Sequence, residues 1–71
     1  MKNIKVKGEY IQLNQFLKLE NVVMSGGEAK AMIESGEVKV NGEVTNVIRK
    51  KLFTGDTVEV DGDVYQIEAD Q

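Results

Sequence analysis

The sequence IQLNQFLKLENVVMSGGEAKAMIESGEVKVNG, residues 11–42, contains two short helical patterns followed by a strand pattern. The first helix is predicted over about residues 13–20. Within it, Leu13, Phe16 and Leu17 recur at the i, i+3, i+4 spacing that places apolar side chains on one face of a helix. The polar residues between them would then lie on the solvent side of this helix.

The second helix is bounded by residues with clear capping roles. Ser25 is a favourable N-cap, and Glu28 can bond back to the Ser25 backbone N–H, which together form a capping box. Gly36 ends the helix after Ser35, because glycine enters the left-handed C′ conformation without a steric penalty. The apolar link over residues 22–24 is expected to pack beneath both helices. The apolar face of the second helix consists of Ala29, Met32 and Ile33.

The pattern then changes to the period of two that is typical of a strand. Val38 and Val40 point to one face, and Lys39 points to the other, toward solvent and beside the start of the second helix. Asn41-Gly42 is a strong hairpin signal. A loop of three residues beginning at Asn41 is predicted, because it pairs Val40 with Val44 and keeps the apolar side chains on one face.

These features together resemble the RNA-binding domain named after ribosomal small-subunit protein four, here called the S-four type, in its stand-alone short bacterial form. The resemblance covers about residues 11–60. It rests on the spacing of Leu13-Asn14-x-Phe16-Leu17, Ser25, Ala29, Ile33, Gly36-x-Val38-x-Val40-Asn41-Gly42 and Leu52-x-x-Gly55-Asp56-x-Val58. It implies an α+β fold, the alpha-L motif, in which two angled helices pack on a small, bent, mostly antiparallel β-sheet. We therefore expect one such domain over residues 1–71.

The two ends of the chain are expected to extend this sheet. Residues 1–10 alternate apolar side chains with lysines, which predicts an edge strand, or alternatively a basic arm that contacts phosphate. Asp61-Gly62 predicts a two-residue hairpin loop that pairs Val58 with Tyr65. Residues 68–71 are expected to fray.

The composition is that of one small domain. A chain of 71 residues buries only about 60% of its unfolded surface, so its core is modest. The sequence contains neither cysteine nor histidine, which removes disulfides, thiolate chemistry, the commonest general base and the commonest metal ligand. No apolar run approaches the ~20 residues of a membrane span, and the N-terminus lacks the apolar region of a signal peptide. We expect a cytoplasmic location.

The charge is unevenly distributed along the chain. Residues 1–55 contain all nine lysine and arginine residues with six glutamates, a net charge of +3. Residues 56–71 contain the other six acidic residues and no basic residue, a net charge of −6. Because exposed charges more than about 10 Å apart are largely screened at 0.1 M salt, an acidic half can coexist with a basic face. These charges are equally consistent with ordinary solvation of the surface.

The sequence argues against a catalytic role. Asp61-Gly62-Asp63 is its best acidic cluster, but a hairpin turn favours Asp and Gly for conformational reasons alone. The cluster also lacks the ligand spacing of a calcium loop. The spacing of Gly26-Gly27 does not fit a nucleotide-binding loop. We expect no enzyme activity, no cofactor and no metal ion.

The resemblance implies that the two helices and the following strand and turn dock on structured RNA, chiefly through polar and basic groups that contact the backbone. For Lys39 a solvated lysine is the alternative interpretation, and Asn41 is required by the turn itself. The candidate RNA-binding residues are Asn14, Lys18, Ser25, Gly26, Gly27, Lys30, Lys39, Asn41, Arg49, Lys50 and Lys51.

Three positions that are usually basic in this family are not basic here. They are occupied by Gln12, Gly26 and Glu37. Each phosphate contact on a duplex contributes about 0.9 to the salt dependence of binding. Weaker or more selective binding than that of a typical family member is therefore predicted.

Two features are predicted to compensate for these lost charges. Gly26-Gly27 lies in the first turn of the second helix, where unpaired N–H groups and the helix dipole attract phosphate. Alternatively, the glycines merely relax a tight turn. Arg49-Lys50-Lys51 is predicted to form a loop in which two side chains can contact phosphate, or alternatively a solvated loop.

The predicted function is non-catalytic recognition of ribosomal or transfer RNA in ribosome assembly, quality control or RNA maturation. We expect a monomer whose partners are structured RNA and, beyond it, the ribosome or a ribosome-associated protein, with no membrane partner. The alternative is a protein-interaction module in which the acidic hairpin of residues 56–70 contacts a basic partner.

Overall fold

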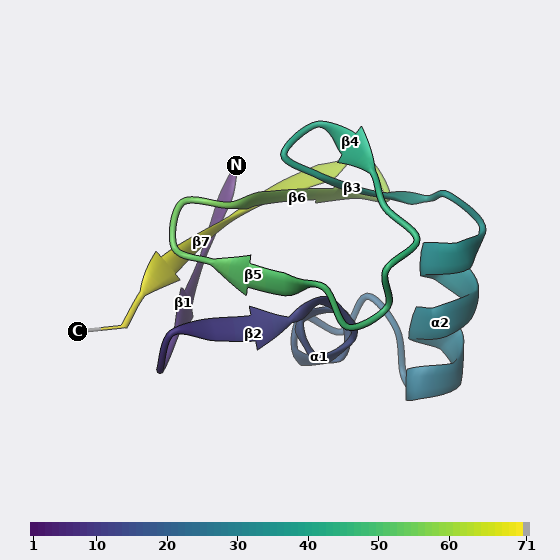
Figure 1. Cartoon of the computed structure of the whole chain (residues 1–71), viewed down its shortest axis with the longest axis horizontal. Helices are drawn as coiled ribbons and strands as arrows, with labels where there is room; N and C mark the ends of the chain where they lie inside the picture. The colour runs from purple at the N-terminus through teal and green to yellow at the C-terminus, as the bar shows by residue number, and fades with distance from the viewer. Residues whose placement is uncertain (71) are drawn as a thin grey trace.

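The computed structural model describes residues 1–70 and contains two helices and two β-sheets (Figure 1). Five strands form one sheet in the order β1-β7-β6-β3-β4, and β2 pairs with β5 in a two-stranded sheet. Within residues 1–70, the β1–β7 pair is parallel and the other pairs are antiparallel. Neither helix in these residues is long and apolar enough to cross a membrane. The elements are β1 (Lys2–Val6), β2 (Tyr10–Gln12), α1 (Leu13–Leu19), α2 (Gly26–Glu34), β3 (Val38–Val40), β4 (Glu43–Val44), β5 (Lys51–Phe53), β6 (Thr57–Val60) and β7 (Asp63–Ala69).

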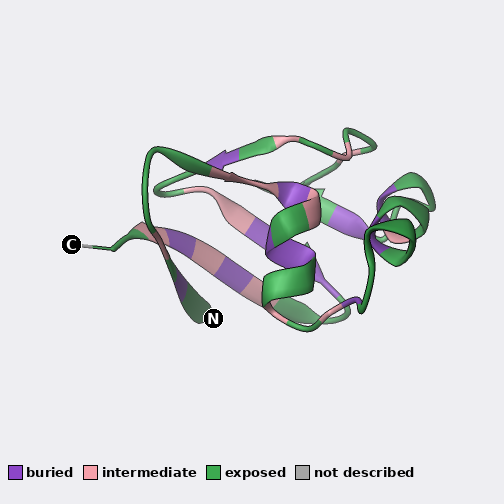
Figure 2. Cartoon of the chain, turned by 90° about the horizontal axis from the view of Figure 1, so that it is seen from below, coloured by how far each residue is buried: buried purple, intermediate pink, exposed green. Residues whose placement is uncertain are grey.

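The predicted α+β architecture is confirmed, and both helices lie within about one residue of their predicted bounds. Buried residues of the helices and of alternate strand positions form one core, and Figure 2 shows where they lie along the chain. Phe16 of α1 is fully buried and meets Tyr65 of β7 edge to face, with 5.2 Å between the ring centroids. Such aromatic pairs contribute about 0.5–1.5 kcal/mol beyond their buried area. The rest of the core consists of Ile4, Leu13, Leu17, Val23, Ala29, Ile33, Val38, Val40, Leu52, Val58, Val60 and Ile67.

Both ends of α2 are capped by the residues that the sequence indicates. The Ser25 hydroxyl oxygen accepts a 3.2 Å hydrogen bond from the Glu28 backbone N–H. At the other end, Gly36 has a φ of 84° and its N–H donates to the carbonyl of Ile33. The next N–H along the chain donates to the carbonyl of Met32. These two bonds form a Schellman motif, which requires the left-handed residue at C′.

The Asn41-Gly42 loop contains two residues, so the predicted loop of three residues is wrong. Val40 pairs with Glu43, and Lys39 pairs with Val44. Asn41 and Gly42 have φ values of 53° and 84°, the backbone that a type I′ turn requires. Because β4 is an edge strand and its Val44 is 56% exposed, little core packing is lost when this valine faces solvent. Turn geometry therefore outweighs strand alternation here.

Two other local predictions have different outcomes. Asp61-Gly62 forms the predicted two-residue loop, and Val58 pairs with Tyr65. In the link between the helices, Val23 is buried, as predicted, but Met24 is 92% exposed. The link therefore packs beneath the helices only in part.

The C-terminal segment is held more firmly than the sequence suggests. β7 continues to Ala69, which pairs with Val6 of β1, and the Asp70 N–H donates to the Val6 carbonyl over 3.0 Å. The prediction of fraying is wrong for residues 68–70, because β1 provides a partner strand. The prediction for Gln71 lies outside the described residues. β1 is an edge strand, as predicted.

Replacing Gly36 with alanine should lower the free energy of unfolding by about 1–2 kcal/mol, because an L side chain is strained at positive φ. Gly26→Ala is the matched control, since Gly26 is helical and an added Cβ there meets no atom within 4 Å. The control should be neutral or stabilising by up to about 1 kcal/mol. Urea denaturation followed by circular dichroism measures both; equal losses would contradict the capping role of Gly36.

Candidate nucleic-acid interface

The loop that carries Arg49 and Lys50 is fastened to the start of α1. The Leu13 N–H donates to the Lys50 carbonyl over 2.8 Å, and the Asn14 N–H donates to the Ile48 carbonyl over 3.1 Å. These bonds satisfy two of the N–H groups that the first turn of a helix leaves unpaired. The basic loop is therefore held against the helix by the backbone itself.

The three consecutive basic residues, 49–51, lie in different structural environments. Arg49 is exposed in a turn, and Lys50 is half-buried. Lys51 lies in β5 and not in the predicted loop; it pairs with Gln12 of β2. The Lys51 ammonium is 4.9 Å from the ring centroid of Tyr10. The prediction that the whole run is a loop is wrong for Lys51, because a non-local strand pairing extends into it.

The polar face of α1 carries two of the predicted residues. Asn14 and Lys18 are four positions apart, so they lie on the same side of the helix. Lys18 is exposed and Asn14 is half-buried. The Asn14 side-chain oxygen is buried and has no hydrogen-bond partner within residues 1–70. The backbone bond from Asn14 to Ile48 brings this face together with the basic loop.

The first turn of α2 is open to solvent. Gly26 and Gly27 are exposed and helical. An added Cβ would meet no atom within 4 Å at Gly26, and only the Ser25 hydroxyl at 3.9 Å at Gly27. Neither packing nor a positive φ requires glycine at these positions, so relaxation of a tight turn does not account for them. Lys30, one turn further on, is exposed.

Lys39 lies apart from the start of α2. β3 follows the C-terminal end of that helix (Figure 1), and the nine residues of α2 span about 13 Å. The prediction that Lys39 lies beside the start of the second helix is therefore wrong. Lys39 is exposed and pairs directly with Glu59 of β6. The adjacent carboxylate reduces the positive potential that Lys39 offers to a phosphate.

The Asn41 side chain is used inside the protein. Its Oδ1 accepts a 2.9 Å hydrogen bond from the Thr57 N–H, and its Nδ2 donates to Asp56 Oδ1 over 3.1 Å. The other Asp56 carboxylate oxygen accepts a 2.8 Å bond from the Phe53 N–H. Asn41 therefore links the β3–β4 turn to the turn before β6, which agrees with its interpretation as a turn residue.

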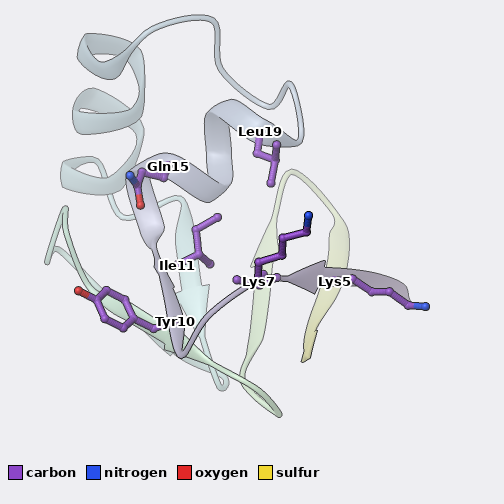
Figure 3. A pocket seen from close by; sticks show the side chains of 7 residues that line it. Lys5, Lys7, Tyr10, Ile11, Gln15 and Leu19 are labelled. Atoms are coloured by element: carbon purple, nitrogen blue, oxygen red, sulfur yellow. The ribbon is translucent and has the colours of Figure 1, made fainter. Parts of the chain in front are cut away.

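A groove of about 380 Å³ lies between β1, β2 and α1. Figure 3 shows Lys7, Ile11 and Leu19 gathered around it, while Lys5 extends away from the others. Tyr10 lies at one end of this groove and points away from Leu19. Sequence patterns did not indicate this groove, because it depends on how three consecutive elements, β1, β2 and α1, are angled against one another in the fold.

The fold and sequence match known proteins. A family model described as S4 domain matches residues 4–68. A relative from Bacillus subtilis (strain 168), named "Probable ribosome maturation protein RlbA", is 48% identical over 59 residues, which cover 83% of each chain. YbcJ from Escherichia coli (strain K12) is 40% identical over 63 residues, which cover 89% of this chain and 90% of YbcJ.

Two solved structures share the architecture. The solution structure of YbcJ from E. coli is described as revealing an αL motif involved in RNA binding. It matches 96% of this chain and 85% of its own, with 37% identity and a TM-score of 0.67. The 30S ribosomal protein S4e from Thermoplasma acidophilum matches 83% of this chain and 31% of its own, with 22% identity and a TM-score of 0.62. The second likeness shows the fold alone, and the predicted alpha-L resemblance is confirmed.

Replacing Asn41 with alanine should lower the free energy of unfolding by about 1–3 kcal/mol through its lost hydrogen bonds alone. Asp61→Ala is the matched control, because Asp61 also precedes a glycine in a two-residue turn and has a φ of 56°. Its side chain makes no hydrogen bond or ion pair that the structure records within residues 1–70. Both substitutions place alanine at a positive φ, so they share the same backbone strain, and thermal unfolding of both variants isolates the contribution of the Asn41 hydrogen bonds. An equal loss of unfolding free energy in the two variants would contradict the role of Asn41 in linking the two turns.

Proposed function

We propose that this chain, which belongs to the S4 domain family, binds structured RNA by recognising the backbone and the shape of the RNA, and that it catalyses no reaction. Ribosomal RNA is the proposed target, and ribosome maturation in the bacterial cytoplasm is the proposed process. The name of RlbA and the description of the YbcJ structure support this proposal. Transfer RNA is the competing structured target in the tests below.

The observation that carries the proposal is the attachment of Arg49 and Lys50 to the start of α1. It holds two cationic side chains beside the helix face that bears Asn14 and Lys18. Side chains presented from a fixed backbone lose less freedom on binding than side chains of a mobile loop. Arg49 can also contact a phosphate with two parallel hydrogen bonds.

The acidic residues of positions 56–70 repel RNA only weakly from this basic surface. Asp56 is occupied by hydrogen bonds to Phe53 and Asn41, and Asp63 pairs with Lys2 at 3.6 Å on the surface. The charge of Asp63 is thus offset by an ion pair, and the Asp56 carboxylate is held by hydrogen bonds within the chain. The same pairing argues against the alternative in which the acidic hairpin contacts a basic protein.

The proposed contact surface is narrower than the predicted set of residues. Ser25 and Asn41 are assigned to holding the helix and the turn, because their side chains are hydrogen-bonded internally. Lys39 is assigned to the periphery, since it lies opposite Glu59. The residues proposed to contact RNA are Asn14, Lys18, Gly26, Gly27, Lys30, Arg49, Lys50 and Lys51.

The double variant Arg49→Ala/Lys50→Ala should weaken binding to a structured ribosomal RNA fragment and lower the salt slope by about 2, at about 0.9 for each lost phosphate contact. Lys5→Ala/Lys7→Ala removes the same charge from the β1 side and should keep the slope. The measurement is fluorescence anisotropy across a salt series, with single-stranded RNA, transfer RNA and duplex DNA as comparisons. Equal slopes for the two variants would contradict a localised surface, and no binding at low salt would overturn the proposal.

Gly27→Glu should weaken RNA binding several-fold, because a carboxylate at the start of α2 repels an approaching phosphate. Gly27→Gln is the control of equal size without the charge. Both variants should remain folded, since an added Cβ at Gly27 has its nearest neighbour at 3.9 Å. If glutamate and glutamine have the same effect in the anisotropy titration, no phosphate approaches this helix end.

A further inference from the structure

Two aromatic side chains are exposed side by side on the two-stranded sheet. Tyr10 of β2 and Phe53 of β5 are directly paired, with ring centroids 5.9 Å apart and ring planes inclined at 52°. Tyr10 is 39% exposed and Phe53 is 46% exposed, whereas the other aromatic residues, Phe16 and Tyr65, are buried. Neither exposed ring contributes to the core, so packing alone does not account for them.

The outer face of this sheet carries a positive charge and no acidic residue. Because side chains alternate between the faces of a strand, Gln12 and Lys51 lie on the same face as Tyr10 and Phe53. Leu52 points the other way and is fully buried. The outer face thus has two aromatic rings at one end and an amide and an ammonium group at the other.

Lys51 connects the aromatic pair with the basic run. Its ammonium group is 4.9 Å from the Tyr10 ring centroid, a cation–π distance. Lys51 directly follows Lys50, whose carbonyl accepts the hydrogen bond from the start of α1. The aromatic pair is therefore continuous with the surface proposed to contact RNA.

We infer that Tyr10 and Phe53 form a stacking site for one unpaired nucleobase of the bound RNA, and that Lys51 contacts the adjoining phosphate. This inference rests on the proposed function and extends it from backbone contacts to a contact with a base. Unpaired bases in the loops and bulges of RNA can be splayed out and stack on aromatic side chains of a protein. Because stacking tolerates any base, the site selects a structural feature of the RNA and not a sequence.

The chemistry of this face favours a nucleotide over a protein segment. A nucleotide combines a flat π-face with a negative phosphate, and the sheet offers exposed rings beside an ammonium group. The strand register holds the two rings in fixed relative positions, so little side-chain freedom is lost on stacking.

The test uses two synthetic RNA hairpins with the same stem, one with a single bulged adenosine and the other with an abasic nucleotide at that position. Both carry the same phosphates, so only the base differs. The wild-type protein should bind the adenosine hairpin roughly fivefold to a hundredfold more tightly, the range for stacking of one base on an aromatic side chain. Tyr10→Leu and Phe53→Leu should each reduce this preference and leave binding of the abasic hairpin unchanged.

Three control variants separate stacking from other effects. Tyr10→Phe keeps the ring and should keep the preference. Lys51→Ala should lower the salt slope for both hairpins by about 0.7–0.9. Leu19→Ala removes an apolar side chain that is 58% exposed and does not belong to the aromatic pair. This variant should bind both hairpins with the affinity of the wild-type protein. Circular dichroism confirms that each variant is folded.

The outcomes distinguish this inference from the proposed function. If both hairpins bind with equal affinity and Tyr10→Leu has no effect, the stacking site is refuted while RNA binding stands. If Tyr10→Leu weakens both hairpins equally, the ring supports the fold or the backbone contacts and the inference also fails. If neither hairpin, nor the ribosomal RNA fragment, binds at low salt, the proposed function fails and the inference fails with it.

Discussion

Two backbone hydrogen bonds, from Leu13 and Asn14 to the carbonyls of Lys50 and Ile48, hold together the parts of this molecule that matter for binding. They join the start of α1 to a loop more than thirty residues away in the sequence. On one side of this junction, β2 and β5 pair, and Leu52 fills the core. On the other side, the polar face of α1 meets the basic loop. The helix supplies donors that it cannot satisfy internally, and the loop gains a defined position.

The sequence predicts the helices and their ends well because the responsible interactions are local. The Ser25 hydroxyl accepts a hydrogen bond from the N–H of Glu28, three residues away, and the Schellman motif at Gly36 spans six residues. Two of the strands, β2 and β5, were harder to predict. Their sequences, Tyr10–Gln12 and Lys51–Phe53, show no clear alternation of apolar and polar side chains, and the strands form because they pair with each other. The Asn41-Gly42 loop shows the reverse case, in which local turn chemistry outweighs alternation on an exposed edge.

The candidate site was predictable in its residue types and less so in its geometry. Charge counting locates all the basic residues in the first 55 positions. It does not reveal that the Asp56 carboxylate accepts hydrogen bonds from the Asn41 side chain and the Phe53 N–H. Nor does it reveal that Lys39 lies opposite Glu59. Four aromatic residues alone do not indicate a stacking site, and the pairing of Tyr10 with Phe53 was not predictable because the two residues lie far apart in the sequence. Such features depend on register, which the sequence specifies only through the whole fold.

The parallel pairing of β1 with β7 has a consequence for how the protein is made. β1 is translated before β7, with more than fifty residues between the two strands, so β1 has no partner strand until β7 has been made. Contacts between distant segments also form slowly. During that interval the lysines at positions 2 and 5 discourage β1 from pairing with strands of other nascent chains. Lysines on an edge strand therefore act against pairing between chains, an effect that is separate from any contact with RNA.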